Sequence, residues 1–300
     1  MAINHFPVCY MLPWMFSRQT TGSVVCPACG SLVGVNDDKC YTCGRWNPGL
    51  WGYAPLLRRL GNDFGFLPVV LYGCVGLYTI SLLLTVKGGG DIMGGGLFSI
   101  LSPGRGATLR LGLSGAYPVF GFGMWWTILS AGWLHGSALH IVFNMMVVRQ
   151  IGPITADIYG GSRLVIIYVV SSACGFLLSS IAGVVMPRLP IIGGADFTLG
   201  ASAAVFGLVG SLMYYGRRGG SSLMTSQLTS WIVTMAIFGV IVPGIDNYAH
   251  AGGYAGGYLV GMWLDPLRPE RITHMLGAMA CLLATALSIL WSFIWVSSLA

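Results

Sequence analysis

One serine and one histidine stand in Gly-rich apolar stretches and have the side chains that acyl transfer needs. Ser202 ends a Gly-Ala-Ser sequence, and His250 begins a His-Ala-Gly-Gly sequence. An imidazole beside a serine hydroxyl can take the hydroxyl proton while the oxygen attacks a carbonyl carbon. His140 and Asn144 lie four residues apart, on one face of a helix, and both side chains can donate hydrogen bonds to an oxyanion. These four residues are therefore candidates for a nucleophile, a base and an oxyanion hole.

Four cysteines in one short tract form a second candidate site. Cys26-Pro-Ala-Cys29 and Cys40-Tyr-Thr-Cys43 are two C-x-x-C pairs, each followed by a glycine that suits a tight turn. A two-residue gap lets both thiolates of one turn reach the same Zn²⁺, which prefers four tetrahedral ligands. The spacing predicts a structural zinc ribbon whose folding energy comes from the metal, and we expect no cofactor for catalysis. Two disulfides or two redox pairs are the alternative, and they would need an oxidising compartment.

The composition excludes several classes of protein. Hydrophobic residues make up 55% of the 300 residues and charged residues only 8%, against roughly 25% charged in an average soluble domain. So few charges cannot cover a water-facing surface. This excludes a soluble globular enzyme, a disordered chain and a nucleic-acid-binding domain of the usual charged type. We expect the lipid bilayer as a partner and no nucleic acid.

Seven apolar stretches approach the roughly 20 residues that a membrane-spanning helix needs. They are Leu67–Val86, Ser137–Ile154, Leu164–Met186, Leu199–Tyr215, Leu228–Pro243, Tyr248–Leu264 and Met275–Val296. The pattern predicts an all-α polytopic membrane protein with seven spans. The second stretch is interrupted by His140, Asn144 and Arg149, and the sixth is short and rich in glycine. Because polar groups are costly in hydrocarbon, those in weak spans are expected to face a protein interior and to serve a function.

The distribution of Lys and Arg predicts the orientation of the chain. With a cytosolic N-terminus, eleven basic residues lie on the cytosolic side and four on the outer side, which the positive-inside rule favours. The four outer residues are Lys87, Arg105, Arg110 and Arg188. The zinc ribbon is then cytosolic, and the C-terminus lies outside. A bacterial-type plasma membrane suits the short loops, and an organelle membrane is the alternative.

In this topology the candidate catalytic residues share a shallow depth near the outer face. His140 and Asn144 begin the second span, Ser202 begins the fourth and His250 begins the sixth. Small residues at four-residue intervals would let the fourth and sixth spans approach closely. They are Ala203, Gly207 and Ser211 in the fourth span, and Gly253, Gly257 and Gly261 in the sixth. Phe206 is placed to support the imidazole ring of His250.

Each of these residues alone has a simpler interpretation. A serine in a membrane helix often bonds to its own backbone carbonyls. A lone histidine more often satisfies a polar contact than it catalyses a reaction. The shared depth of residues from three separate spans favours a functional site over these separate explanations.

Three motifs together resemble the rhomboid family of intramembrane serine proteases. They are Gly-Ala-Ser in the fourth span, His-Ala-Gly-Gly-x-x-x-Gly in the sixth, and His135-x4-His140-x3-Asn144 at the start of the second. The resemblance covers Leu67 to Leu264, about two-thirds of the chain. It implies a six-helix bundle with one extra C-terminal helix. It also implies a dyad of Ser202 and His250, with an oxyanion hole formed by His140, Asn144 and the Ser202 amide.

Three further positions bear on this resemblance. Thr127 follows two tryptophans where the family often has Arg after Trp, which puts in doubt the anchoring of the loop and the substrate preference. His135 matches a family position with a structural role. Asp246 lies four residues before His250 and would complete a triad, but the family pattern does not require an acid.

The sequence predicts five segments and one main function. Residues 1–25 form an interfacial or flexible segment rather than a cleavable signal peptide, 26–47 the zinc ribbon, 48–66 a linker, 67–264 the rhomboid-like membrane domain, and 265–300 a loop and the extra helix. The expected function is a serine endopeptidase that cuts transmembrane segments of other membrane proteins near the outer face. A catalytically silent relative that binds membrane clients is the alternative. A transporter with polar residues along a pathway is a third interpretation.

Overall fold

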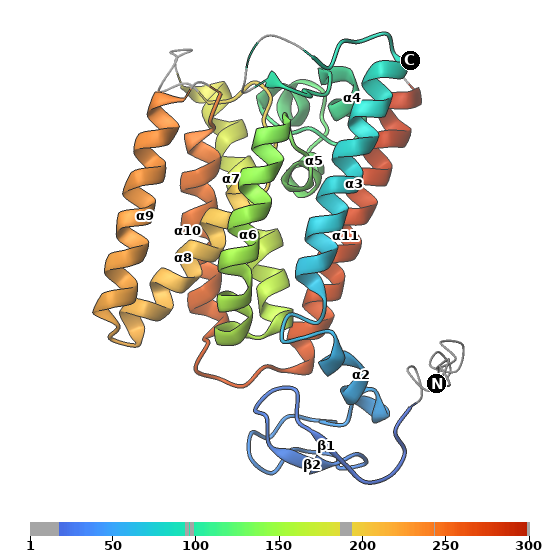
Figure 1. The fold of residues 1–300 in the computed structure, drawn as a ribbon, viewed down its shortest axis with the longest axis vertical. Coiled ribbons are helices and arrows are strands. Elements are labelled where there is room, and N and C mark those ends of the chain that lie inside the picture. Colours follow the sequence, from blue (N-terminus) through green and yellow to red (C-terminus); the bar gives the residue numbers. More distant parts are fainter. Residues whose placement is uncertain (1–17, 94–95, 97–98, 187–193, 243, 299–300) are drawn as a thin grey trace, which may run out of the picture.

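In the part of the chain that the structure describes, seven long helices form the main body (Figure 1). The computed structural model describes residues 18–93, 96, 99–186, 194–242 and 244–298, so most of the segment expected to be interfacial lies outside the described residues. The long helices are α3 (Phe66–Lys87), α6 (Ala138–Tyr159), α7 (Gly161–Val185), α8 (Ser202–Arg218), α9 (Ser222–Ile241), α10 (Asn247–Leu264) and α11 (Ile272–Ser298). Each predicted span overlaps one of these helices, and the all-α fold is confirmed.

Helix length and composition support membrane insertion. Among the described residues, α3, α7, α9 and α11 are individually long and apolar enough to cross a membrane. A fifth span results if the short helices α5 (Thr127–Ser130) and η5 (Ala131–Trp133) are joined to α6 across a bend of 91°. The 17-residue α8 is buried along nearly its whole length, whereas α9 buries only Gly239. The chain is therefore an integral, polytopic helical membrane protein.

Two helix boundaries differ from the prediction for local reasons. α9 begins at Ser222 rather than at Leu228, because the Ser221 side chain accepts a hydrogen bond from the Met224 amide and caps the helix. α6 continues through Pro153 to Tyr159 instead of ending at Ile154. It ends where Gly160 adopts a φ of +87°, a conformation that glycine accepts without steric cost.

The centre of the bundle is the packing of α8 against α10, with α7 beside both. A Cβ built on Gly253 would lie 2.1 Å from the Ala203 carbonyl oxygen, and one on Gly257 would lie 1.9 Å from the Gly207 carbonyl oxygen. The two backbones therefore touch, as the small-residue stripes predicted. Helices packed this closely leave little freedom for the residues at their first turns.

A small domain with four cysteines lies at one end of the bundle (Figure 1). Its strands β1 (Ser23–Val25) and β2 (Leu32–Gly34) pair antiparallel, with Val24 opposite Val33. η2 (Leu50–Gly52) and α2 (Ala54–Arg59) lead from it towards α3. Its buried core is small and extends to Ile272 and Met275 at the start of α11. The domain is therefore packed against the membrane bundle rather than separated from it.

A buried ion pair joins this domain to the bundle. The Arg45 guanidinium lies 4.0 Å from a carboxylate oxygen of Glu270, and the two side chains are 2% and 3% exposed. The Glu270 carboxylate also accepts hydrogen bonds from the amides of Ser162 and Arg163 at the start of α7. Arg163 in turn donates to the carbonyl of Leu264 at the end of α10. One cluster thus connects the cysteine domain with α7, α10 and the loop before α11.

The long connection between α3 and α6 lies at the opposite end of the bundle from the cysteine domain (Figure 1). Its described part contains α4 (Arg105–Arg110), the single π-helical turn η4 (Tyr117–Gly121), α5 and η5. Phe120, Phe122 and Trp125 are exposed, which suits a loop at the level of the lipid headgroups. Trp126 is different, because it packs against α11.

Candidate active site and candidate metal centre

Ser202 is the first residue of α8, and the turn before it requires glycine. Gly200 has a φ of +128°, and a Cβ there would lie 2.6 Å from the His140 ring. The Gly200 amide donates a hydrogen bond to the carbonyl of Ala131 in η5, at 3.0 Å. The Gly-Ala-Ser sequence therefore sets the entry to α8 directly against the His140 side chain.

His250 lies in the first turn of α10, and Phe206 on α8 supports its ring. The two rings are stacked, with centroids 4.2 Å apart and an angle of 15° between their planes. Ala203 and Ala249, the neighbours of Ser202 and His250 in the chain, lie in one buried cluster. The structure therefore brings the segments that carry Ser202 and His250 into contact.

Asp246 caps α10. Its side chain accepts a hydrogen bond from the Ala249 amide at 2.9 Å and another from the hydroxyl of Ser179 on α7. These contacts satisfy the helix end. They give Asp246 a structural role as the cap of α10.

His140 and Asn144 face the same region from α6. The Gly136 amide donates to His140 Nδ1 at 3.3 Å. In a neutral imidazole, a nitrogen that accepts a hydrogen bond carries no proton, so this contact favours the tautomer with the proton on Nε2. Nε2 is one of the two ring atoms beside Gly200. Asn144 Nδ2 donates to the His140 carbonyl at 2.8 Å, which uses one of its two N–H groups.

The structure also shows the surroundings of the two other family-related positions, His135 and Thr127. His135 is 1% exposed, and its ring meets that of His140 edge to face with centroids 5.2 Å apart. Thr127 is fully buried; its hydroxyl donates to the carbonyl of Met124 at 2.8 Å and lies 3.3 Å from the hydroxyl of Ser114. The backbone of Ser114 forms two hydrogen bonds with that of Thr198, just before Gly200. Thr127 is thus part of an anchored loop although it is not Arg.

Sequence reasoning missed two structural links, one next to the candidate active site and one far from it. One is the hydrogen bond from Gly200 to Ala131, which joins the Ser202 turn to the loop before α6. The other is the buried pair of Arg45 and Glu270 at the far end of α10. Backbone hydrogen bonds between distant loops do not depend on particular side chains, so a single sequence does not predict them. The single acidic residue between two basic ones in Arg268-Pro-Glu270-Arg271 was the one available signal for the second link.

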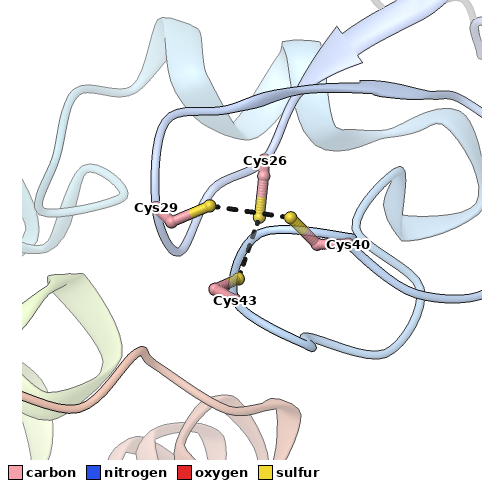
Figure 2. A group of neighbouring side chains, drawn as sticks. All are labelled: Cys26, Cys29, Cys40 and Cys43. Carbon is pink, nitrogen blue, oxygen red and sulfur yellow. Dashed lines mark hydrogen bonds between the residues drawn. The ribbon is translucent and has the colours of Figure 1, made fainter.

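The four cysteines of the N-terminal domain point towards one another (Figure 2). Their sulfur atoms all lie within 4.8 Å of one another, with Cys26 Sγ 3.8 Å from Cys43 Sγ and Cys29 Sγ 3.6 Å from Cys40 Sγ. Disulfide bonding needs about 2.05 Å, so these are free thiols. A tetrahedral zinc site with Zn–S bonds of 2.3 Å has sulfur atoms about 3.8 Å apart. The four residues therefore fit a single metal ion, with two ligands from each C-x-x-C turn.

Two of these thiols have pKa values that are shifted in opposite directions. At Cys40 burial acts to raise the pKa, but hydrogen bonds from the backbone amides of Cys43 and Thr42 outweigh it and lower the pKa to about 6. Burial raises the pKa of Cys43 to about 12. Metal ligation by thiolates therefore has to displace protons from part of the set. Burial also raises the pKa of Glu270, against the opposing effects of the Arg163 amide and of the Arg163 and Arg45 charges.

Fold and site together define a polytopic helical membrane protein with polar side chains gathered at the first turns of α6, α8 and α10. Residues 122–267 match the model of one family, the rhomboid domain. This part of the chain is therefore a rhomboid domain. Ser202, His250, His140 and Asn144 all lie inside the matched range, whereas the cysteine domain and α11 lie outside it.

Curated relatives agree with this assignment. The chain is 31% identical over 143 residues to RHOMBOID-like protein 4 of Arabidopsis thaliana, covering 46% of this chain and 34% of the relative. It is 32% identical over 150 residues to RHOMBOID-like protein 7 of the same plant, covering 46% and 42%. It is 30% identical over 172 residues to rhomboid protease GluP of Bacillus subtilis (strain 168), covering 56% and 32%. The chain thus spans less than half the length of each of these relatives.

Proposed function

We propose that this chain is an intramembrane serine endopeptidase with Ser202 as nucleophile and His250 as general base. The observation that carries the proposal is the close packing of α8 and α10 at their first turns, where Phe206 stacks on His250 one helical turn from Ser202. A serine and an imidazole held on facing rigid helices are the parts that an activated nucleophile needs. One relative, GluP, is itself named a protease.

The proposed reaction is acyl transfer followed by hydrolysis. The His250 imidazole takes the proton of Ser202 as the oxygen attacks the carbonyl carbon of a peptide bond. His250 then gives that proton to the leaving amine, and the acyl-enzyme forms. A water molecule, deprotonated by His250, releases the second product. The parallel ring of Phe206 holds the imidazole at a fixed angle through both steps.

We assign the oxyanion hole to three donors. The Ser202 backbone N–H belongs to the first turn of α8, where amides have no partner within the helix and the helix dipole favours negative charge. The Nε2–H of His140 lies beside Gly200, and Asn144 retains one N–H after bonding to the His140 carbonyl. Each such donor stabilises the charge that develops on the oxygen.

The substrate class follows from where these residues lie in the bundle. The first turns of α6, α8 and α10 lie towards the end of the bundle that is opposite the cysteine domain (Figure 1). With the orientation that the Lys and Arg distribution favours, that end is the outer face and the cysteine domain is cytosolic. A transmembrane substrate would be cut near the outer face. Its helix must unwind locally, so small residues or proline near the cleaved bond should help, and replacing them with Leu should slow cleavage.

The same proposal assigns Zn²⁺ to the four cysteines as a structural ion. Four thiolates in this arrangement suit zinc, and the ion would supply the folding free energy of a domain with a very small core. Residues 26–47 then form a zinc ribbon that caps residues 67–264, the membrane domain. The catalytic residues do not contact this site.

A fluorophosphonate probe tests the proposed function. Purified wild type should be labelled covalently at Ser202, whereas Ser202→Ala and His250→Ala should not be labelled. Ser298→Ala is the matched control, because Ser298 lies at the exposed end of α11, where its hydroxyl donates to the Trp295 carbonyl. Folded wild-type protein that takes up no label would overturn the protease proposal in favour of a silent, client-binding rhomboid.

A further inference from the structure

The buried side of α11, the helix outside the matched rhomboid range, is unexpectedly polar. Its buried residues are Ala278, Thr285, Ser288 and Ser292, whereas large apolar side chains cover its exposed sides. Hydroxyl groups three and four residues apart share one face of a helix. That face lies against the loop that contains α4 and α5.

Two of these hydroxyls hold one tryptophan of the loop. Trp126 Nε1 donates to Ser292 Oγ at 2.9 Å, and Ser288 Oγ donates to the Trp126 carbonyl at 2.7 Å. Thr285 behaves differently, because its hydroxyl bonds to the carbonyl of Cys281 in its own helix. Ser288 and Ser292 therefore form hydrogen bonds from α11 to the loop, and not only within their own helix.

Ring contacts and a glycine also contribute to this contact between Trp126 and α11, which we call the joint. The rings of Trp291 and Trp295 meet the Trp126 ring edge to face, with centroids 6.2 and 6.0 Å away. A Cβ on Gly112, which has a φ of +100°, would lie 2.1 Å from Ser130 Oγ and 3.0 Å from Ser292 Oγ. The loop thus lies directly against α11 at two separate points of its chain.

The short helix α5 connects this joint to the candidate active site. Trp126 immediately precedes α5, and Ile128 in α5 packs against the buried cluster that contains Ala203 and Ala249. Ala131, which follows α5, belongs to that cluster and accepts the hydrogen bond from Gly200. The path from Ser292 to the Ser202 turn therefore consists of packed and hydrogen-bonded contacts throughout.

We propose that Ser288 and Ser292 are positioning residues that hold Trp126 and thereby fix α5 against the first turns of α8 and α10. This inference rests on the proposed function, because the segment that they fix carries the contacts next to Ser202 and His250. α11 then performs the anchoring that an Arg at position 127 would be expected to perform. Neither serine touches the substrate or the reacting atoms.

The experiment compares wild type with Ser288→Ala, Ser292→Ala, the double variant and Trp126→Phe, with Ser298→Ala as control. The first readout is the concentration dependence of fluorophosphonate labelling, which separates the maximal rate kinact from the binding constant of the probe. The second is hydrogen exchange of the amides of residues 127–136. The fraction of protein that is finally labelled reports the folded amount.

Each lost hydrogen bond should lower kinact about threefold to tenfold, with the final labelled fraction unchanged and faster exchange across residues 127–136. Adding Ser292→Ala to Trp126→Phe should cause no further loss, because both remove the same bond. Rates and exchange equal to those of Ser298→Ala would overturn the proposal. So would a loss of labelled fraction in parallel with thermal stability, which indicates a general folding role.

Wild type that fails to label would overturn the proposed function, and with it the catalytic meaning of the joint. Hydrogen exchange still decides whether the joint exists in that case. Faster exchange in the double variant would establish that α11 anchors the loop, and unchanged exchange would exclude it.

Discussion

The ring of Phe206 lies parallel to the imidazole of His250, with their centroids 4.2 Å apart. Phe206 also contacts Trp231 on α9, with ring centroids 5.3 Å apart. One side chain therefore connects the candidate base to α9, a helix that buries only Gly239.

Replacing Phe206 with Leu should slow labelling of Ser202 about threefold to tenfold, since a stacked aromatic pair contributes about 0.5–1.5 kcal/mol beyond area burial. The imidazole would lose its flat support but keep its place on α10. Labelling kinetics with the fluorophosphonate measure the effect. Phe293→Leu, at a 40% exposed position of α11, is the control and should leave the rate unchanged. Equal rates in both variants would show that the stack does not orient the base.

Asp246 provides a test of dyad against triad. Asn caps helices about as well as Asp, so Asp246→Asn should keep both the fold and the labelling rate close to wild type. Asp246→Ala should lower the free energy of unfolding by about 1 kcal/mol through loss of the cap. Thermal unfolding and labelling kinetics separate the two effects. A loss of about 10⁴-fold in the Asn variant, as expected for an acid that orients the base, would contradict a purely structural role.

The sequence was sufficient where a local rule leads directly to geometry. The spacing of Gly253 and Gly257 against Ala203 and Gly207 predicted which backbones would touch, because close helix approach requires small side chains at a fixed interval. The C-x-x-C pairs likewise predicted four sulfur atoms around one point. Both inferences depend only on residue type and helical or turn periodicity.

The sequence was insufficient where the geometry depends on elements far apart in the chain. The side chain of Trp126 is of the type that is common at the membrane interface. Only the fold reveals that Ser288 and Ser292, more than 160 residues later, form hydrogen bonds with it. Glu270 is a charged residue in a loop, where side chains are usually exposed, yet it lies buried against Arg45. Propensity and hydropathy contain no information about such partners. A buried polar group needs a hydrogen-bond partner, but many different hydroxyls or carboxylates could provide it.

The contact between α8 and α10 predicts a strong effect at Gly257. In Gly257→Ala the new Cβ would lie 1.9 Å from the Gly207 carbonyl oxygen, so the two helices must separate. We expect a loss of about 1–3 kcal/mol in stability, as for overpacked cores, and slower labelling because Ser202 and His250 move apart. Gly76→Ala on α3 is the matched control, since its Cβ would meet nothing within 4 Å. Thermal unfolding in detergent compares them, and equal stability would contradict the close approach.

The pair of Arg45 and Glu270 predicts a second stability effect, far from the candidate active site. Glu270→Ala leaves Arg45 buried without its counter-charge and the Ser162 and Arg163 amides without their acceptor. Removing one member of a buried pair costs about 3–5 kcal/mol. Arg218→Ala is the control, because its side chain is 46% exposed in its pair with Asp265 and should contribute less than about 1 kcal/mol. Similar thermal stability of the two variants would show that the buried pair does not hold the domains together.

Metal removal should destabilise more than the cysteine domain itself. Ile272 and Met275 at the start of α11 pack against the core of that domain, so its unfolding exposes them and removes the support of the buried Arg45. Cys40→Ser, or treatment of wild type with a chelator, should release one equivalent of bound zinc. It should also lower the unfolding temperature of the whole protein, because the ion supplies the folding free energy of its site. Elemental analysis and thermal unfolding measure the two effects.

Cys281→Ser, in α11 and away from the cluster, should retain the ion and the stability. Zinc loss without any change in unfolding temperature would show that the ribbon and the bundle fold independently.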